Sequence, residues 1–116
     1  NDPRMLSTIR ATQNELASPD GFIYRYKGFD DGLDGDEGTF NICTLWLCDN
    51  LIMLGDLDAA KELFDKVLSH ANDLGLLSEQ ISPDGSELLG NFPQAFSHLS
   101  IINTAVQLQK ATNNRR

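Results

Sequence analysis

The chain has 116 residues, of which 41% are hydrophobic and 22% are charged, and this composition is typical of one globular domain rather than a disordered or fibrous chain. Seventeen acidic residues against nine basic ones give a formal net charge of −8, which argues against nucleic acid as a partner, because that binding depends on clustered lysine and arginine. No run of eighteen apolar residues is present, so we expect no membrane partner, whereas a neutral ligand is compatible with the composition.

Four segments have the apolar pattern of α-helices. Residues 2–16 and 57–71 each combine an apolar stripe with a polar face, so we expect both to cover a core from outside. Residues 39–54 and 93–109 are apolar around most of their circumference, which predicts inner helices, and Pro93 suits the first turn of the second one. The predicted fold is therefore all-α, with four antiparallel helices in the order outer, inner, outer, inner.

The predicted connections differ greatly in length. Gly55 and Asp56 alone join the second and third helices, where glycine suits a left-handed helix end and aspartate an N-cap. Residues 18–38 and 72–92 are long loops, and the first holds an apolar, β-prone piece at 22–26 before a turn rich in glycine and aspartate. The first and third connections of an up-down-up-down series lie at the same end, so we expect both long loops to face one side, where functional residues usually gather.

Three side chains in these loops are candidates for a functional site. Glu79 has leucine and isoleucine neighbours, so its carboxylate lies either at the rim of an apolar cleft or in solvent as an ordinary loop acid or cap. Arg25 lies between two tyrosines, where its planar fork of donors suits a sugar hydroxyl or a carboxylate, and a structural ion pair with a nearby aspartate is an equal alternative. Glu37 either caps the second helix, our preferred interpretation, or reaches the same cleft.

The acidic turn that begins at Asp30 resembles a calcium-binding loop only in part. Asp34 and Gly35 stand at loop positions five and six, but Gly32 at position three and Asn41 at position twelve remove required ligands, including the bidentate one. We therefore expect no calcium at this turn.

The remaining metal-ligand and aromatic residues favour structural roles. His70 and His98 have no second ligand at helical spacing, so we expect neither a zinc site nor another cofactor. Cys43 and Cys48 point about 140° apart around one helix, which predicts two buried free thiols and mildly favours a reducing compartment such as the cytoplasm. Trp46 lies in the same apolar segment, where we expect it to be a core residue rather than a sugar platform.

Three blocks of this sequence resemble glycoside hydrolase family 15, which comprises the glucoamylases and the glucoamylase-like and trehalase-like enzymes. The blocks are YRY leading into GLDGDEGTF at 24–40, CTLWL at 43–47, and GLLSEQ followed by GNFPQAFSH at 75–98, of which the last is highly specific. The resemblance implies that residues 1–116 are a C-terminal fragment of an (α/α)6 barrel, with the four helices as its last third and the active site in the loops at one end.

The resemblance also implies roles for the candidate residues. Glu79 would be the general base of an inverting, exo-acting α-glucosidase, which removes a proton from the water that attacks the terminal glucose of an α-glucosidic oligosaccharide or of trehalose. Arg25 matches an arginine that holds sugar hydroxyls, Tyr26 lies beside it, and Glu37 matches an acidic position at the pocket rim. The family's general acid lies upstream of these blocks, so we expect the chain to be inactive without the remainder of the barrel, and we expect the apolar surfaces of 40–54 and 92–108 to be partly exposed or covered by another copy.

A rival interpretation comes from residues 55–68, which resemble one helix of a tetratricopeptide repeat. It predicts a non-enzymatic helical module that binds a protein partner. Against it, the sequence has no self-similarity at a period of about 34 residues, and its long loops exceed the turns of such repeats. Convergence of Arg25, Glu37 and Glu79 on one end favours the hydrolase, whereas a solvated Glu79 favours the module.

Overall fold

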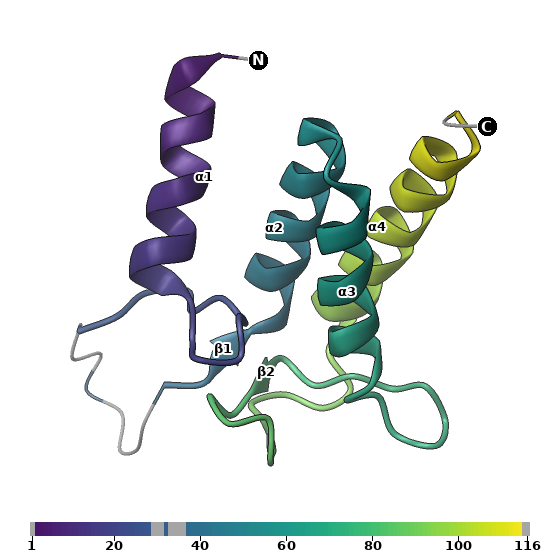
Figure 1. Ribbon diagram of the computed structural model, residues 1–116. Coiled ribbons are helices and arrows are strands. Elements are labelled where there is room, and N and C mark those ends of the chain that lie inside the picture. The colour runs from purple at the N-terminus through teal and green to yellow at the C-terminus, as the bar shows by residue number, and fades with distance from the viewer. Residues whose placement is uncertain (1, 29–31, 33–36, 115–116) are drawn as a thin grey trace.

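The computed structural model describes residues 2–28, 32 and 37–114, and most of them lie in four helices. These helices are α1 (Pro3–Leu16), α2 (Asn41–Leu54), α3 (Leu57–Leu68) and α4 (Ala95–Asn113). Three short strands, β1 (Thr39–Phe40), β2 (Gln80–Ile81) and β3 (Leu88–Leu89), form an antiparallel sheet in the order β1-β2-β3. Successive helices run in opposite directions, which confirms the predicted all-α class (Figure 1).

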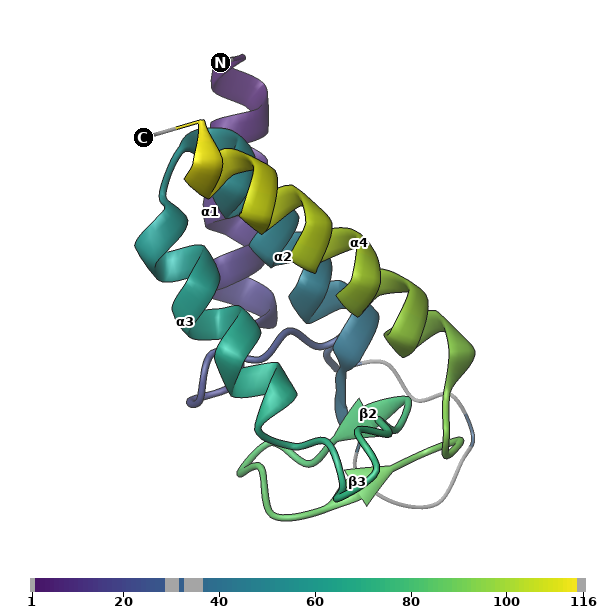
Figure 2. The same ribbon diagram turned by 90° about the vertical axis from the view of Figure 1, so that its right-hand side faces the viewer.

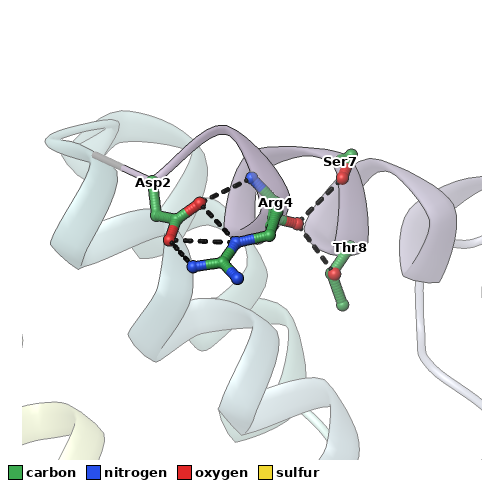
Figure 3. A network of polar contacts seen from close by, with 4 residues as sticks. All are labelled: Asp2, Arg4, Ser7 and Thr8. Atoms are coloured by element: carbon green, nitrogen blue, oxygen red, sulfur yellow. Dashed lines mark hydrogen bonds and ion pairs between the residues drawn. The ribbon is translucent and has the colours of Figure 1, made fainter.

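The start of α1 shows how local polar residues fix a helix end. Asp2 is the N-cap, and its Oδ1 accepts a hydrogen bond from the backbone nitrogen of Arg4 at 2.9 Å, while Pro3 takes the first helical position (Figure 3). The hydroxyls of Ser7 and Thr8 both donate to the carbonyl oxygen of Arg4, at 2.8 and 2.9 Å. The Arg4 side chain is 90% exposed, so its ion pair with Asp2 adds little to stability.

The tight turn between α2 and α3 agrees with the sequence prediction. Gly55 has a φ of 83°, in the left-handed region that favours glycine, and it ends α2. Asp56 caps α3 because its Oδ1 accepts a hydrogen bond from the backbone nitrogen of Ala59 at 3.3 Å. This turn makes α2 and α3 antiparallel neighbours, and α4 packs against both.

Several predicted helix ends are wrong. Thr39 and Phe40 form β1 instead of the first turn of the second helix, since they pair with residues of β2. Pro93 precedes α4 and is outside its first turn, because Gln94 is the N-cap and its side chain accepts a hydrogen bond from Phe96. The third helix ends at Leu68 rather than at residue 71, and the fourth continues past residue 109.

The core lies around α2, and loop residues complete it. Leu45 and Cys48 on α2 are fully buried. One core cluster joins them to side chains of α3 and of both long loops: Phe22, Phe64, Val67, Leu77 and Ile81. Residues of the long loops therefore belong to the same core cluster as residues of α2 and α3.

Both predicted inner helices expose apolar side chains, as expected. On α4 only Ser97 and Thr104 are buried. The large apolar side chains of α4 that remain 42–63% exposed are Phe96, Leu99, Ile102 and Val106. On α2, Met53 is 67% exposed. Within the described residues, no helix is long and apolar enough to cross a membrane.

The prediction that Trp46 is a core residue is wrong, because this side chain is 55% exposed. Trp46 lies on the side of α2 that faces α1, where the two helices stand apart (Figure 1). A cavity of about 210 Å³ opens there, lined by apolar residues such as Met5 and Ile9 of α1 and Leu47 of α2. The apolar pattern of α2 could not show that one of its sides lacks a close neighbour.

Candidate active site

The two long loops meet at one end of the helices, as the loop order predicts. Tyr24 of the first loop forms a bridge with Thr39 of β1, and Thr39 pairs in turn with Ile81 of β2 in the other loop. Figures 1 and 2 show the small sheet below the helices, at the end where α2 and α4 begin. The sheet therefore ties together the segments that carry Arg25, Glu37 and Glu79.

Backbone contacts fix the first loop just before Arg25. Ile23 is 2% exposed, and its backbone nitrogen donates to Oγ1 of Thr44 on α2 at 2.9 Å. The backbone nitrogen of Phe40 donates to the carbonyl oxygen of Ile23 at 2.8 Å. The β-prone piece of the sequence is thus a buried, paired segment, and Arg25 leaves it at a defined place.

The segment before Glu79 is held from the start of α4. The backbone nitrogen of Leu77 donates to Nε2 of His98 at 3.2 Å, and the carbonyl oxygen of Leu77 accepts from the backbone nitrogen of Gln94 at 3.0 Å. The carbonyl oxygen of Ser78 accepts from Oγ of the buried Ser97 at 2.7 Å. Every one of these contacts limits the motion of the backbone that carries Glu79.

Glu79 itself is held through its backbone and one carboxylate oxygen. Its carbonyl oxygen accepts from the backbone nitrogen of Asn41, the first residue of α2, at 3.1 Å. Its Oε2 accepts from the backbone nitrogen and from Nδ2 of Asn91, at 3.0 and 2.9 Å. Among the described residues, none donates a hydrogen bond to Oε1. Within the described part of the chain, the half-buried carboxylate is therefore anchored by one oxygen only.

Gly90 lies directly against this carboxylate. Its φ is +72°, and a Cβ built at this position would stand 2.9 Å from Oε2 and 3.0 Å from Cβ of Glu79. Both distances are shorter than ordinary van der Waals contacts, so a side chain at position 90 would displace Glu79. The glycine lets the backbone approach the carboxylate closely.

Arg25 forms a polar group with Tyr26 and Glu37. Its Nη2 donates to the hydroxyl of Tyr26 at 2.9 Å and lies 3.5 Å from Oε1 of Glu37, which also accepts from Nε2 of Gln80 at 2.9 Å. The hydrogen bond to Tyr26 raises the pKa of Arg25, and the negative charges of Glu37 and Glu79 add to that rise. The Arg25 side chain is 47% exposed, so it remains accessible to a ligand.

The preferred interpretation of Glu37 as a helix cap is wrong. The N-cap of α2 is Phe40, and no side chain makes a capping hydrogen bond there. Glu37 instead bridges Arg25 and Gln80, which was the alternative that reaches the site. Arg25 does form an ion pair, but its described partner is this glutamate, and the nearby aspartates 30, 31, 34 and 36 lie outside the described residues.

The calcium-loop comparison also depends on residues outside the described ranges, namely Asp30, Asp34 and Gly35. Asn41, its twelfth position, uses Nδ2 to donate to the carbonyl oxygen of Ser78 at 2.8 Å. In the described part of the chain, no group of three or more histidine, cysteine, aspartate or glutamate side chains could hold a metal ion.

Cys43 and Cys48 are free thiols, as predicted. Burial raises the pKa of Cys48 to about 12, so this thiol stays protonated at neutral pH. Cys43 is only half-buried and lines the cavity between α1 and α2.

The residues that hold Glu79 in place had no role assigned from the sequence. Asn41 and Ser97 are each 1% exposed although they stand in apolar segments. A polar residue inside an apolar helix is a usable signal, because buried polar groups are nearly always hydrogen-bonded. Asn91 gives no such signal, since it is exposed and lies in a loop.

A helical scaffold whose loops fix one carboxylate beside an arginine suits a glycoside hydrolase, which uses carboxyl groups on either side of the scissile bond. The model of the family described as "Glycosyl hydrolases family 15" matches residues 1–106. The chain belongs to this family, and its four antiparallel helices are a segment of the (α/α)6 barrel.

Several curated relatives are similar over nearly the whole chain. The trehalase of Mycolicibacterium smegmatis is 45% identical over 113 residues, which cover 96% of this chain and 17% of that protein. The trehalase of Thermoplasma acidophilum is 43% identical over 111 residues, or 96% of this chain and 19% of that protein. Trehalase 1 of Sulfolobus acidocaldarius is 38% identical over 101 residues. The chain thus spans less than a fifth of the length of these relatives, and no solved structure matches it significantly.

Proposed function

We propose that the chain is the C-terminal part of the catalytic barrel of an inverting glycoside hydrolase that cleaves trehalose, with Glu79 as the general base. Trehalose is preferred over an α-glucan oligosaccharide because the relatives compared above carry the name trehalase. The observation that carries the proposal is the asymmetry of the Glu79 carboxylate, which accepts two hydrogen bonds at Oε2 and none from the described residues at Oε1.

This asymmetry suits a base that acts on water. Asn91 fixes Oε2, so the lone pairs of Oε1 keep a constant direction and can accept the proton of a water molecule. As the proton moves to Oε1, the water oxygen bonds to the anomeric carbon and the bond to the leaving sugar breaks. An acid about 6.5 to 9.5 Å away must protonate that sugar in inverting enzymes, and we assign no residue of this chain to it.

Arg25, Tyr26 and Glu37 are proposed to bind the sugar that is cleaved. The described hydrogen bonds of the Arg25 guanidinium use only Nη2, so its other nitrogens can donate to sugar hydroxyls. Glu37 can accept from a sugar hydroxyl while Gln80 and Arg25 hold it in place. The mutual position of these groups, next to the backbone of β1 and β2, supports a pocket that orients one ring against Glu79.

The alternative of a tetratricopeptide-like binding module loses its support. Its sequence basis was one helix, α3, whereas the family model matches residues 1–106, which include α1, α2, α3 and most of α4. Glu79 is also not a freely solvated loop acid, because three hydrogen bonds join it to Asn91. Oε2 of Glu79 accepts two of them, and the backbone nitrogen of Glu79 donates the third to the carbonyl oxygen of Asn91.

The test uses a grafted trehalase, in which this chain replaces the 113 aligned residues of the M. smegmatis protein. We expect the grafted trehalase to release glucose from trehalose and the 116-residue chain alone to release none. Glu79→Gln should lower turnover by about 10²- to 10⁴-fold, because it removes the proton acceptor at nearly constant shape.

Glu87→Gln is the matched control, since Glu87 is an exposed glutamate of the same loop and should leave turnover unchanged. A grafted trehalase that keeps its turnover with Glu79→Gln would refute the role of Glu79. Glucose release by the chain alone would refute the claim that it needs the remainder of the barrel.

A further inference from the structure

Asn91 makes three hydrogen bonds to a single residue. Its carbonyl oxygen accepts from the backbone nitrogen of Glu79 at 2.9 Å, and its own backbone nitrogen donates to Oε2 at 3.0 Å. The third bond runs from Nδ2 to the same Oε2 at 2.9 Å. Two donors thus converge on one oxygen of Glu79.

Only the third bond requires asparagine. The two backbone bonds would form with almost any residue at position 91, so they account for the loop but not for the side chain. The amide lies in an exposed position, where a packing role has little value. Hydrogen bonds to charged groups are about twice as strong as neutral ones, so Nδ2 has a substantial effect on where the carboxylate points.

We propose that Asn91 is the positioning residue for Glu79: it holds Oε2 so that Oε1 is the oxygen presented to the attacking water. This inference rests on the proposed function of Glu79 as a base. Gly90 belongs to the same arrangement, because its missing side chain leaves room for Oε2 next to the backbone. Asn91 touches neither the attacking water nor the sugar and acts through Glu79 alone.

Asn91→Ala removes Nδ2 and keeps both backbone bonds. In the grafted trehalase it should lower kcat by about 10- to 100-fold, because a carboxylate misplaced by about 1 Å loses alignment, while KM changes little. Asn91→Asp keeps the shape of the side chain but places an oxygen against Oε2, so its kcat should fall at least as far. Asn103→Ala is the matched control, since Asn103 donates Nδ2 to Oδ2 of Asp49 at 3.1 Å between α4 and α2.

Removing the base, Glu79, distinguishes an effect of Asn91 through Glu79 from a purely structural effect of Asn91. In a Glu79→Ala grafted trehalase, azide can attack the anomeric carbon without a base, forming a carbon–nitrogen bond as the bond to the leaving sugar breaks and that sugar takes up a proton. Adding Asn91→Ala should leave this azide reaction unchanged, because the residue through which Asn91 acts is already absent.

The outcomes separate the two claims. Full turnover of Glu79→Ala without azide would refute the proposed function itself. Loss of turnover in Glu79→Ala together with wild-type kcat in both Asn91 variants would refute only the positioning role. An azide reaction that Asn91→Ala weakens as much as it weakens trehalose hydrolysis would also refute it, because Asn91 would then act on the fold or the sugar.

Discussion

The orientation of Glu79 depends on the absence of a side chain at position 90. Gly90→Ala places a methyl group 2.9 Å from Oε2 and forces a non-glycine residue into a left-handed backbone. We expect a loss of about 1–3 kcal/mol in the free energy of unfolding, measured by urea denaturation of the chain.

Gly75→Ala is the control for this prediction. Its φ of +75° is nearly the same, but nothing lies within 4 Å of the added methyl group, so it isolates the backbone cost. Equal losses for the two variants would mean that the contact between position 90 and Glu79 is not tight.

At this scale the sequence could identify charged residues but not their partners. Glu79, Arg25 and Glu37 were found from their neighbours and from family blocks. The role of Asn91 depends on how the loop at 82–90 brings position 91 back to position 79. The apolar pattern of the sequence does not predict this contact. The same reason explains why the predicted role of Glu37 was wrong. Its position near the start of α2 in the sequence suggested a helix cap, whereas Gln80 and Arg25 bind it in the structure.

At the scale of elements, the turn between β2 and β3 depends on one carboxylate. Oδ1 of Asp84 accepts from Oγ of Ser82 at 2.7 Å, and from the backbone nitrogen and Oγ of Ser86 at 3.1 and 2.8 Å. The hydrogen bond from Ser82, followed by those from Ser86, lowers the pKa of Asp84 to about 2. The turn should therefore be stabilised by ionised Asp84 above about pH 4, the usual range of an aspartate, and lose this contribution as the pH falls toward 2.

Carbon-13 NMR of the Asp84 carboxyl group measures this directly. The titration midpoint in the folded chain should lie well below that of the urea-unfolded chain, and Ser82→Ala should raise it. A midpoint that is the same in the folded and unfolded chain would show that these hydrogen bonds do not favour the ionised form.

Helices were predictable from sequence because each runs over several turns of apolar pattern, whereas the strands were not. Each strand has two residues, too few for an alternating pattern to emerge. Pairing across the long loops, such as Thr39 with Ile81, decides that residues 39 and 40 are extended. The order of the loops still predicted that both long loops lie at one end of the helices, because short and long connections alternate.

At the scale of the whole molecule, the exposed apolar surface of α4 requires cover. Phe96, Leu99 and Ile102 are each more than 60% exposed, and such a contiguous surface is unusual for an isolated domain. We expect the chain alone to bind an apolar dye or to self-associate, more so at high salt, which screens its net charge of −8.

Ile102→Lys should reduce dye binding and self-association, because it places a charge in the middle of this surface. Leu74→Lys is the control, since Leu74 is 76% exposed but lies in a loop far from α4 in sequence. A chain that stays monomeric in light scattering and binds no dye would contradict the expectation of an uncovered apolar surface.

Proton NMR of the first products of trehalose hydrolysis by the grafted trehalase shows whether Glu79 activates water in an inverting reaction. Trehalose joins two α-linked glucose units, so attack by water with inversion releases one β-glucose for each α-glucose. We expect equal initial amounts of the two anomers, and loss of both with Glu79→Gln. Initial release of α-glucose alone, or an unchanged product signal with Glu79→Gln, would contradict this expectation.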